Sequence, residues 1–272
     1  MAVITISRQM VSFGDEIAKK VAEDLGYELI DKQSIGQALA SLGLPAAETE
    51  KYDEKKPSIW DSLVIQQNKF MYLIRAAIYD FAGKDNTVIL GRGAQALLAD
   101  LPGTFHVRIV APMEVRIGRL RVQGGIDAKN AERLLRQSDR DSSGFIRAYF
   151  SADWDDADYY DLVINTKHLS IDMAAGMIAS AVQSIEFQTD AGNRSAKLAD
   201  LSLQQQAEVA IMEIHRGNKL FISVANVENG VATLKGTTDS AAVKEECALA
   251  ISKIGGIRQV KNEISVMTAF YG

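Results

Sequence analysis

Cysteine is almost absent from this chain, since Cys247 is the only one among 272 residues. A single cysteine excludes an intrachain disulfide and a zinc site built from cysteines. Proline is scarce too, with 4 residues, and no low-complexity run interrupts a composition that is 47% hydrophobic and 24% charged. These values are typical of a globular protein with a sizeable core.

The chain also lacks a long apolar run. No segment approaches the ~20 residues that a membrane-spanning helix needs, and the first residues, MAVITISRQ, have neither the basic start nor the apolar stretch of a leader peptide. We therefore expect a cytoplasmic protein without a transmembrane segment. The net charge of −5 argues against a nucleic-acid binder, which is usually basic.

Arginine is present but unevenly distributed. Of the 14 arginines, 8 lie between Arg108 and Arg147. From Lys197 onward, 8 basic and 8 acidic residues balance, so the part before it carries the whole negative excess. A group of arginines within an acidic region favours local recognition of an anion.

Alternating strand and helix patterns predict an α/β domain over residues 1–188. Apolar and β-branched runs predict buried strands at 2–7, 27–30, 87–90, 105–110 and 160–164. Helical spacing predicts helices at 15–25, 112–122, 127–149 and 170–185, with 32–85 mostly helical. Because several strands are apolar on both faces, we expect a five-stranded parallel sheet with helices on both faces.

The pattern changes after a polar segment at 189–199, which we interpret as a linker. A helix near 203–215, two alternating strands around Asn229-Gly230, a helix at 240–254 and a strand at 259–267 follow. Asn-Gly between alternating strands is a strong hairpin signal. Residues 200–272 are therefore predicted to form a small α+β domain of αββαβ order.

The first strand, loop and helix form the place where α/β proteins hold phosphate. The usual P-loop reads G-x-x-x-x-G-K-[ST], and the stretch RQMVSFGD does not satisfy it. Arg8, Phe13, Gly14 and Asp15 stand at the four defining positions. From this segment alone, an ordinary strand–helix turn is the favoured interpretation.

A longer stretch, ITISRQMVSFGDEIAKKVAEDLGYELIDK, resembles the start of the cytidylate kinase-like family. The family loop is similar to S-R-[EQ]-x-G-S-G-G-x-E-I-A and lacks the P-loop lysine. Val11 and Phe13 stand where the family has glycines; valine is poorly suited to positive φ, and Phe13 is expected to crowd the phosphate. The positions that match are Ser7, Arg8, Gln9, Ser12, Gly14, Glu16, Ile17 and Ala18.

Later segments resemble the same family in the same order. Gly91-Arg92-Gly93 resembles its Gly-Arg-Asp turn, with glycine in place of the aspartate. Arg116 and Arg119 resemble the Arg-x-x-Arg that precedes the lid, and residues 145–175 resemble the last strand and helix. The stretch similar to the lid itself contains Arg133, Arg136, Asp139, Arg140 and Arg147. For any single arginine, a solvated helix face is the alternative.

The resemblance implies an enzyme, a P-loop kinase-like fold and transfer of the ATP γ-phosphoryl group to a nucleotide such as CMP, with Mg²⁺. Arg8, Arg136 and Arg140 would supply the catalytic positive charge. Asp31 and Arg92 would contact the acceptor, and Asp15 would hold Mg²⁺ through water, unless it is only a helix N-terminal charge. The ATP phosphates would be bound by Ser12, Phe13, Gly14, Asp15, Glu16, Arg116 and Arg119.

Two expectations follow for the site. An anion should lie between the 12–16 backbone and Arg8. In addition, five arginines should point to one cleft at the carboxyl ends of the strands. They are Arg92, Arg116, Arg119, Arg136 and Arg140.

The C-terminal stretch VANVENGVATLKGTTDSAAVKEECALAISKIGGIRQVKNEISV resembles a BON domain. Such domains are thought to bind ligands, membranes or partners and have no known catalytic set. The alternative function is therefore a catalytically inactive nucleotide-sensing or scaffold protein whose BON domain binds a ligand or partner. Val11, Phe13 and Gly93 favour this alternative.

The remaining polar and aromatic candidates are interpreted as structural. His106, His168 and His215 are dispersed and lie near no motif. Trp60 and Trp154 are predicted to pack in the core or between domains rather than to stack on a base.

Overall fold

The structure, a computed structural model, describes residues 2–44, 64–184, 191–214 and 221–267. The chain divides into two compact units. The N-terminal unit comprises Met1–Ile59 and Lys84–Arg194, and the C-terminal unit comprises Trp60–Gly83 and Ser195–Gly272. Helix α4 (Val64–Gly83) thus groups with the C-terminal residues, although strands of the N-terminal unit precede and follow it in the sequence. The domain boundaries at 188 and 200 remain a prediction.

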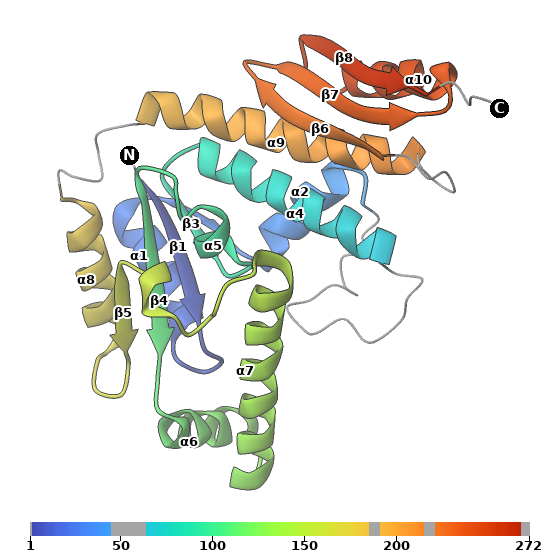
Figure 1. The fold of residues 1–272 in the computed structure, drawn as a ribbon. Helices are drawn as coiled ribbons and strands as arrows, with labels where there is room; N and C mark the ends of the chain where they lie inside the picture. The colour runs from blue at the N-terminus through green and yellow to red at the C-terminus, as the bar shows by residue number, and fades with distance from the viewer. Residues whose placement is uncertain (1, 45–63, 185–190, 215–220, 268–272) are drawn as a thin grey trace. The chain divides into compact units, whose positions relative to one another are not determined.

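The N-terminal unit is built on a five-stranded parallel sheet, as predicted (Figure 1). Its strands run in the order β2-β3-β1-β4-β5. They are β1 (Val3–Arg8), β2 (Glu28–Ile30), β3 (Thr87–Leu90), β4 (Thr104–Val110) and β5 (Leu162–Asn165). Every pair of neighbours is parallel.

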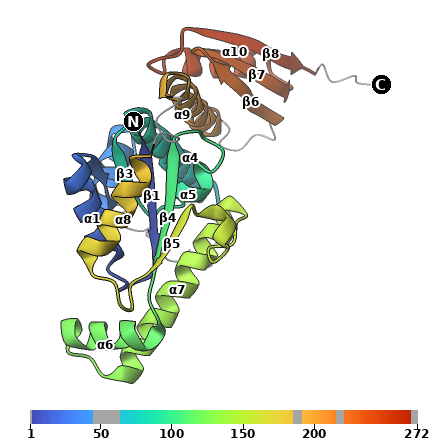
Figure 2. The same ribbon diagram turned by 90° about the vertical axis from the view of Figure 1, so that its left-hand side faces the viewer.

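Helices on both faces cover this sheet, because its strands are apolar on both faces. On one face, α1 (Gly14–Leu25) packs beside α8 (Ile171–Val182), and Figure 2 shows the two helices together. The core under them contains Ile4, Ile17 and Ile178, which are all fully buried. Within its described residues the unit also contains α2 (Lys32–Ser41), α5 (Ala94–Leu97), α6 (Met113–Gly124), α7 (Ala128–Phe150) and the 3-10 turn η2 (Ala157–Tyr159).

The helix predicted near 203–215 begins earlier, as α9 (Ala191–Ile214). The expected linker is polar, but it contains no proline and is rich in residues with good helix propensity. Two of its side chains are also buried. Leu198 is fully buried, and Arg194 pairs with Asp85 and donates to Pro102 O at 3.1 Å. These tertiary contacts stabilise the start of α9, and the composition of the segment does not reveal them.

The C-terminal unit contains the predicted hairpin. β6 (Phe221–Glu228) pairs antiparallel with β7 (Val231–Thr238), which pairs parallel with β8 (Gln259–Val266). Helix α10 (Ala241–Ser252) precedes β8, and its Cys247 is buried in a core shared with α9 and the sheet. No helix in the described part of the chain is long and apolar enough to cross a membrane.

Candidate functional site

Segments that follow four parallel strands meet at one edge of the N-terminal sheet. β1 ends at Arg8, and β2 is followed by Asp31. β3 is followed by the turn 91–93, and β4 by Ala111. Sheets of this kind bind ligands beyond the carboxyl ends of their strands. Since β1 lies between β3 and β4, Arg8 stands at the centre of the candidate site.

The loop between β1 and α1 has a backbone that glycines usually provide. Val11 has a φ of 61° and Phe13 a φ of 68°. Both values are left-handed, which is rare for β-branched and bulky residues. Valine and phenylalanine thus adopt the backbone that we expected to require glycine. Strained conformations of this kind persist only when surrounding contacts impose them, and they cluster at functional sites.

The loop leads into the first turn of α1, whose N–H groups are available. The N–H groups of Gly14, Asp15 and Glu16 donate to no acceptor among the described residues. Free N–H groups and the helix dipole together favour an anion at such a turn. Gly14 allows the loop to close tightly, because a Cβ there would overlap the side chain of Arg8.

Distant side chains hold this loop in place. Arg119 of α6 donates to Val11 O at 3.3 Å and to Thr166 O at 2.7 Å. Its guanidinium also stacks on Phe13, with Cζ 3.7 Å from the ring centroid. Thr166 Oγ1 donates to Ser12 O at 2.8 Å. Phe13 therefore packs against a cation, and Arg119, which we predicted to bind phosphate, bonds to the loop itself.

Arg8 and Asp15 form an ion pair beside the loop. Arg8 Nε lies 3.1 Å from Asp15 Oδ1, and the Asp15 side chain is 63% exposed. The described residues contain no group of three or more side chains that would ligate a metal on its own. Magnesium at phosphate sites is usually held by one or two carboxylates together with the substrate phosphates. Asp15 fits an ion that arrives with a nucleotide.

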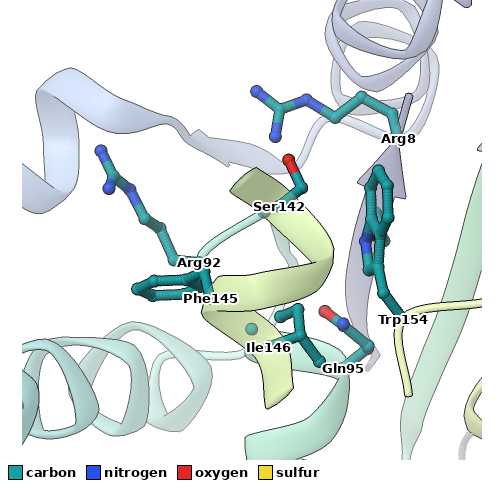
Figure 3. A pocket seen from close by; sticks show the side chains of 10 residues that line it. Arg8, Arg92, Gln95, Ser142, Phe145, Ile146 and Trp154 are labelled. Atoms are coloured by element: carbon teal, nitrogen blue, oxygen red, sulfur yellow. Dashed lines mark hydrogen bonds between the residues drawn. The ribbon is translucent and has the colours of Figure 1, made fainter. Parts of the chain in front are cut away.

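A narrow pocket lies between Arg8 and the turn after β3 (Figure 3). Arg92 is in this turn, with a φ of 59°. In Figure 3 the Arg8 side chain extends above Ser142 of α7 in this view, and the Arg92 side chain extends to one side of that helix. Two guanidinium groups at one pocket can hold a phosphate or a carboxylate. The residues that line the pocket include Ser7, Gln95, Phe145, Ile146 and Trp154.

Gly93 is the position where the family turn has aspartate, and a side chain does not fit there. Its φ is 73°, and a Cβ would overlap the ring of Phe150, at the end of α7. A carboxylate from this turn therefore cannot contribute to the pocket while Phe150 stays in place.

Trp154 forms one wall of the pocket and is 4% exposed. Its Nε1 donates to Ser7 Oγ at 2.8 Å. The guanidinium of Arg108 lies over the indole, 4.0 Å from the centroid, and pairs with Asp155. The prediction that Trp154 is a core residue is confirmed, and the structure adds its place in the pocket wall. Trp60 lies outside the described residues.

The structure does not bring the five predicted arginines into one cleft. Buried Arg116 forms two bonds with Asp139, at 2.8 and 2.9 Å, which join α6 to α7. On the exposed side of α7, Arg136 pairs with Glu132 at 2.7 Å. Arg136 and Arg140 share a separate shallow hollow with other residues of that helix. Of this set, only Arg92 lines the same pocket as Arg8.

Asp31 acts as a helix cap. Its Oδ1 accepts hydrogen bonds from Gln33 N at 2.9 Å and Ser34 N at 3.0 Å at the start of α2. Such a cap stabilises a helix by about 1 kcal/mol. These bonds give Asp31 a structural role, and its contact with the acceptor remains a prediction.

His106 has a structural environment, as expected. It is buried between Thr5 Oγ1 and Thr104 Oγ1, at 2.7 and 3.1 Å from its ring nitrogens. Burial lowers the pKa of His106 below its ordinary value. His168 is exposed, and His215 lies outside the described residues.

Gln95 is a pocket residue that the sequence analysis missed. It follows the turn by two positions, in α5, and is 2% exposed. Its side-chain amide forms no hydrogen bond within the described segments, and Figure 3 shows the amide directed into the pocket. The available clue was a lone amide in the otherwise apolar run AQALLA.

Comparisons with known proteins match both parts of the chain. Residues 3–168 match the model of the cytidylate kinase-like family, and residues 221–268 match the model of the BON domain. Cytidylate kinase from Archaeoglobus fulgidus is 31% identical over 191 residues, which cover 69% of this chain and 98% of that protein. Cytidylate kinase from Natronomonas pharaonis is 27% identical over 190 residues, covering 70% and 93%.

One solved structure supports the fold. The crystal structure of an uncharacterized protein from Eubacterium ventriosum matches with a TM-score of 0.54 and 22% identity. The match covers 68% of this chain and 99% of that chain.

Proposed function

Because this chain belongs to the cytidylate kinase-like family, we propose that it transfers the γ-phosphoryl group of ATP to a nucleotide such as CMP. The observation that carries the proposal is the left-handed loop at Val11 and Phe13, with free N–H groups at the start of α1. Arg8 pairs with Asp15 beside this loop and also lines the pocket that contains Arg92. A cation within reach of both a donor and an acceptor phosphate is suited to phosphoryl transfer.

Each residue of the site has a defined task in this proposal. The N–H groups of 14–16 bind the donor phosphates, and Arg92 orients the acceptor phosphate. Arg8 lies between the two and stabilises the charge on the transferring group. Magnesium bound with ATP would neutralise further phosphate charge, and Asp15 would hold it through water. A catalytic role for Arg136 and Arg140 requires α7 to bring them toward the loop.

The C-terminal unit is proposed to bind a ligand or a protein partner rather than to catalyse. Its match to the BON domain supports a binding role for this unit. Use of ATP as donor supports a cytoplasmic location for the whole protein.

A second candidate function is nucleotide sensing or scaffolding without catalysis. Carboxylates already pair with two of the arginines expected to bind phosphate, in the pairs Arg8–Asp15 and Arg116–Asp139. If these pairs persist in the nucleotide complex, less positive charge is available to the transition state. Under this alternative the protein binds ATP and CMP but does not turn them over.

The test is turnover by the full chain with ATP, Mg²⁺ and CMP, followed by chromatography of the nucleotides. The informative variant is Arg92→Asn, because asparagine tolerates the left-handed backbone at this position. We expect its KM for CMP to rise at least about tenfold, the size of one lost charge-assisted bond. The matched control is Arg121→Ala, on an exposed arginine of α6, which should behave as wild type.

Two outcomes would contradict the proposal. ATP and CMP binding by calorimetry without any product favours the sensing alternative. Equal KM values for Arg92→Asn and wild type remove the proposed acceptor site.

A further inference from the structure

The two borders of the C-terminal sheet differ in how their backbone groups are satisfied. On the β6 border, Gln204 Nε2 donates to Val224 O at 3.3 Å, and Glu208 accepts a hydrogen bond from Val224 N at 2.9 Å. The register of β6 is also irregular between Val224 and Asn226. A border strand that is covered or bulged resists pairing with a further strand. Side chains of α9 therefore close the β6 border.

The β8 border is open. In the described part of the chain, β8 pairs with β7 alone (Figure 1), in a regular parallel register along its 8 residues. Every second residue from Gln259 to Ser265 is exposed, and Val260 and Asn262 on the opposite face are only partly buried. A regular strand with an open border is a template for pairing with another chain.

Hydrogen bonds at the end of β8 show which of its residues direct their backbone groups outward. Met267 N, directly after the strand, donates to Thr238 O of β7 at 2.8 Å. Because successive residues of a strand direct these groups to opposite sides, the odd-numbered residues of β8 bond to β7. The even-numbered residues Val260, Asn262 and Ile264 then face the open border. Ile264 N agrees with this assignment, since it donates to the side-chain oxygen of Asn262 at 3.3 Å.

The charges on β8 are complementary to those of an antiparallel copy of the same strand. Lys261 and Glu263 are both exposed, on either side of Asn262. A two-fold axis at Asn262 places Lys261 opposite the partner's Glu263, and the same pair forms a second time by symmetry. It also brings the outward backbone groups of the two strands together. An axis one residue away in either direction would place like charges directly opposite each other, which is destabilising.

We propose that the C-terminal unit binds a second copy of this chain through antiparallel pairing of the two β8 strands. Three strands from each copy then form one continuous six-stranded sheet. About six backbone hydrogen bonds and two Lys261–Glu263 ion pairs join the copies, and the interface has two-fold symmetry. Addition of a strand to an open sheet border is a recurring mode of recognition. The inference rests on the proposed binding role of this unit and is independent of phosphoryl transfer.

The experiment is sedimentation equilibrium of the full chain at low salt, where charges are weakly screened. A single pair of strands buries less surface than a standard interface, so we expect a dissociation constant of about 1–100 µM. Lys261→Glu and Glu263→Lys should each weaken the dimer at least about tenfold, because each change turns two attractive pairs into two repulsive pairs. Lys253→Glu, on an exposed lysine at the end of α10, is the matched control and should dimerise like wild type.

Mixing the two variants tests the predicted register. One variant then carries two acidic side chains at the pairing positions, and the other carries two basic ones. Together they should form a heterodimer at least about tenfold tighter than the homodimer of either variant, measured by fluorescence anisotropy of a labelled Lys261→Glu chain. A loss of structure cannot produce this rescue. Glu263 also lies 3.8 Å from Lys235, but this exposed pair contributes little to folding.

Two outcomes would overturn the inference. One is a wild-type chain that stays monomeric at concentrations about fivefold above the expected range of dissociation constants, which would leave the border to a strand of another protein. The other is a dimer that neither variant weakens, or a pair of variants that do not combine, since the interface would then lie elsewhere. No nucleotide is present in these measurements, so a failed turnover assay contradicts the kinase proposal alone, and a monomeric chain that phosphorylates CMP contradicts this inference alone.

Discussion

The phosphate loop of the N-terminal unit and the hairpin turn of the C-terminal unit both contain left-handed residues, but they reach that backbone by different routes. The hairpin uses Asn229 and Gly230, with φ values of 49° and 75°. Both residue types adopt this conformation readily. The loop uses Val11 and Phe13, for which the same conformation is unfavourable by roughly 1–2 kcal/mol per residue.

The supporting contacts differ accordingly. Asp200, 29 residues before Asn229, accepts hydrogen bonds from the N–H groups of the hairpin turn at 2.7 and 3.0 Å. The loop depends on Arg119 and Thr166, which lie 108 and 154 residues from the loop atoms they bond. The hairpin turn therefore combines residue types that prefer this backbone with one supporting side chain, whereas contacts more than 100 residues away in sequence hold the loop in a backbone that its residues do not prefer.

The largest effect is expected for Gly230→Ala. A Cβ at this position would lie 2.6 Å from Gly256 O, on a backbone with φ 75°. Overpacking and left-handed strain together should lower the free energy of unfolding by about 2–4 kcal/mol. Urea unfolding followed by the reactivity of the buried thiol of Cys247 reports this unit. Gly255→Ala is the control, because a Cβ there meets nothing within 4 Å. If Gly230→Ala lowers the free energy of unfolding by less than about 1 kcal/mol, the hairpin turn tolerates a side chain at a left-handed position, as the loop does at Val11 and Phe13.

The second prediction concerns a loop in which glycine replaces both left-handed residues, Val11 and Phe13. Val11→Gly with Phe13→Gly removes the left-handed strain and uncovers the guanidinium of Arg119. The entropic cost is roughly 0.5–1 kcal/mol per glycine, and two charge-assisted hydrogen bonds of roughly 1.5–3 kcal/mol each exceed it. ATP should bind at least about ten times more tightly in calorimetry at fixed Mg²⁺.

Arg8→Ala added to this double variant should erase the gain, since Arg8 lies beside the same loop. An unchanged ATP affinity in the double variant would mean that the loop is not a nucleotide site. The N-terminal unit would then be better explained as a scaffold.

The smallest effect concerns pH, and it has opposite signs in the two units. Burial lowers the pKa of His106 in the N-terminal unit and raises the pKa of Glu208 in the C-terminal unit. The stability from neutral His106 is present above about pH 6.5, the unfolded value, and is lost as the pH falls through the lower folded pKa. The stability from protonated Glu208 is full below its unfolded pKa and is lost as the pH rises through the folded pKa.

Acidification from pH 7 to 5 should therefore weaken the N-terminal unit relative to the C-terminal unit. Urea unfolding at both pH values, with Trp154 fluorescence in a Trp60→Phe background for one unit and Cys247 reactivity for the other, measures the difference. His106→Gln should reduce the pH dependence of the N-terminal unit. Equal shifts in both units would contradict this prediction.

Regular elements were predictable from the sequence, and the site was predictable only in part. The β-branched run TVIL corresponds to the observed strand Thr87–Leu90, and Asn-Gly forms the predicted turn. The start of α9 at Ala191 was missed, because the burial of Arg194 and Leu198 does not show in composition.

What the sequence by itself determined is the strands, several of the longer helices, the parallel arrangement of the first sheet and the place of the loop at the end of β1. These follow from apolar periodicity and turn chemistry, which act over a few residues. The tertiary structure decided that Arg116 bonds Asp139, that Phe150 covers Gly93 and that Gln95 faces a pocket. These three contacts join different helices and strands. Which side chains meet there depends on how the elements pack, and the residue types alone do not reveal it.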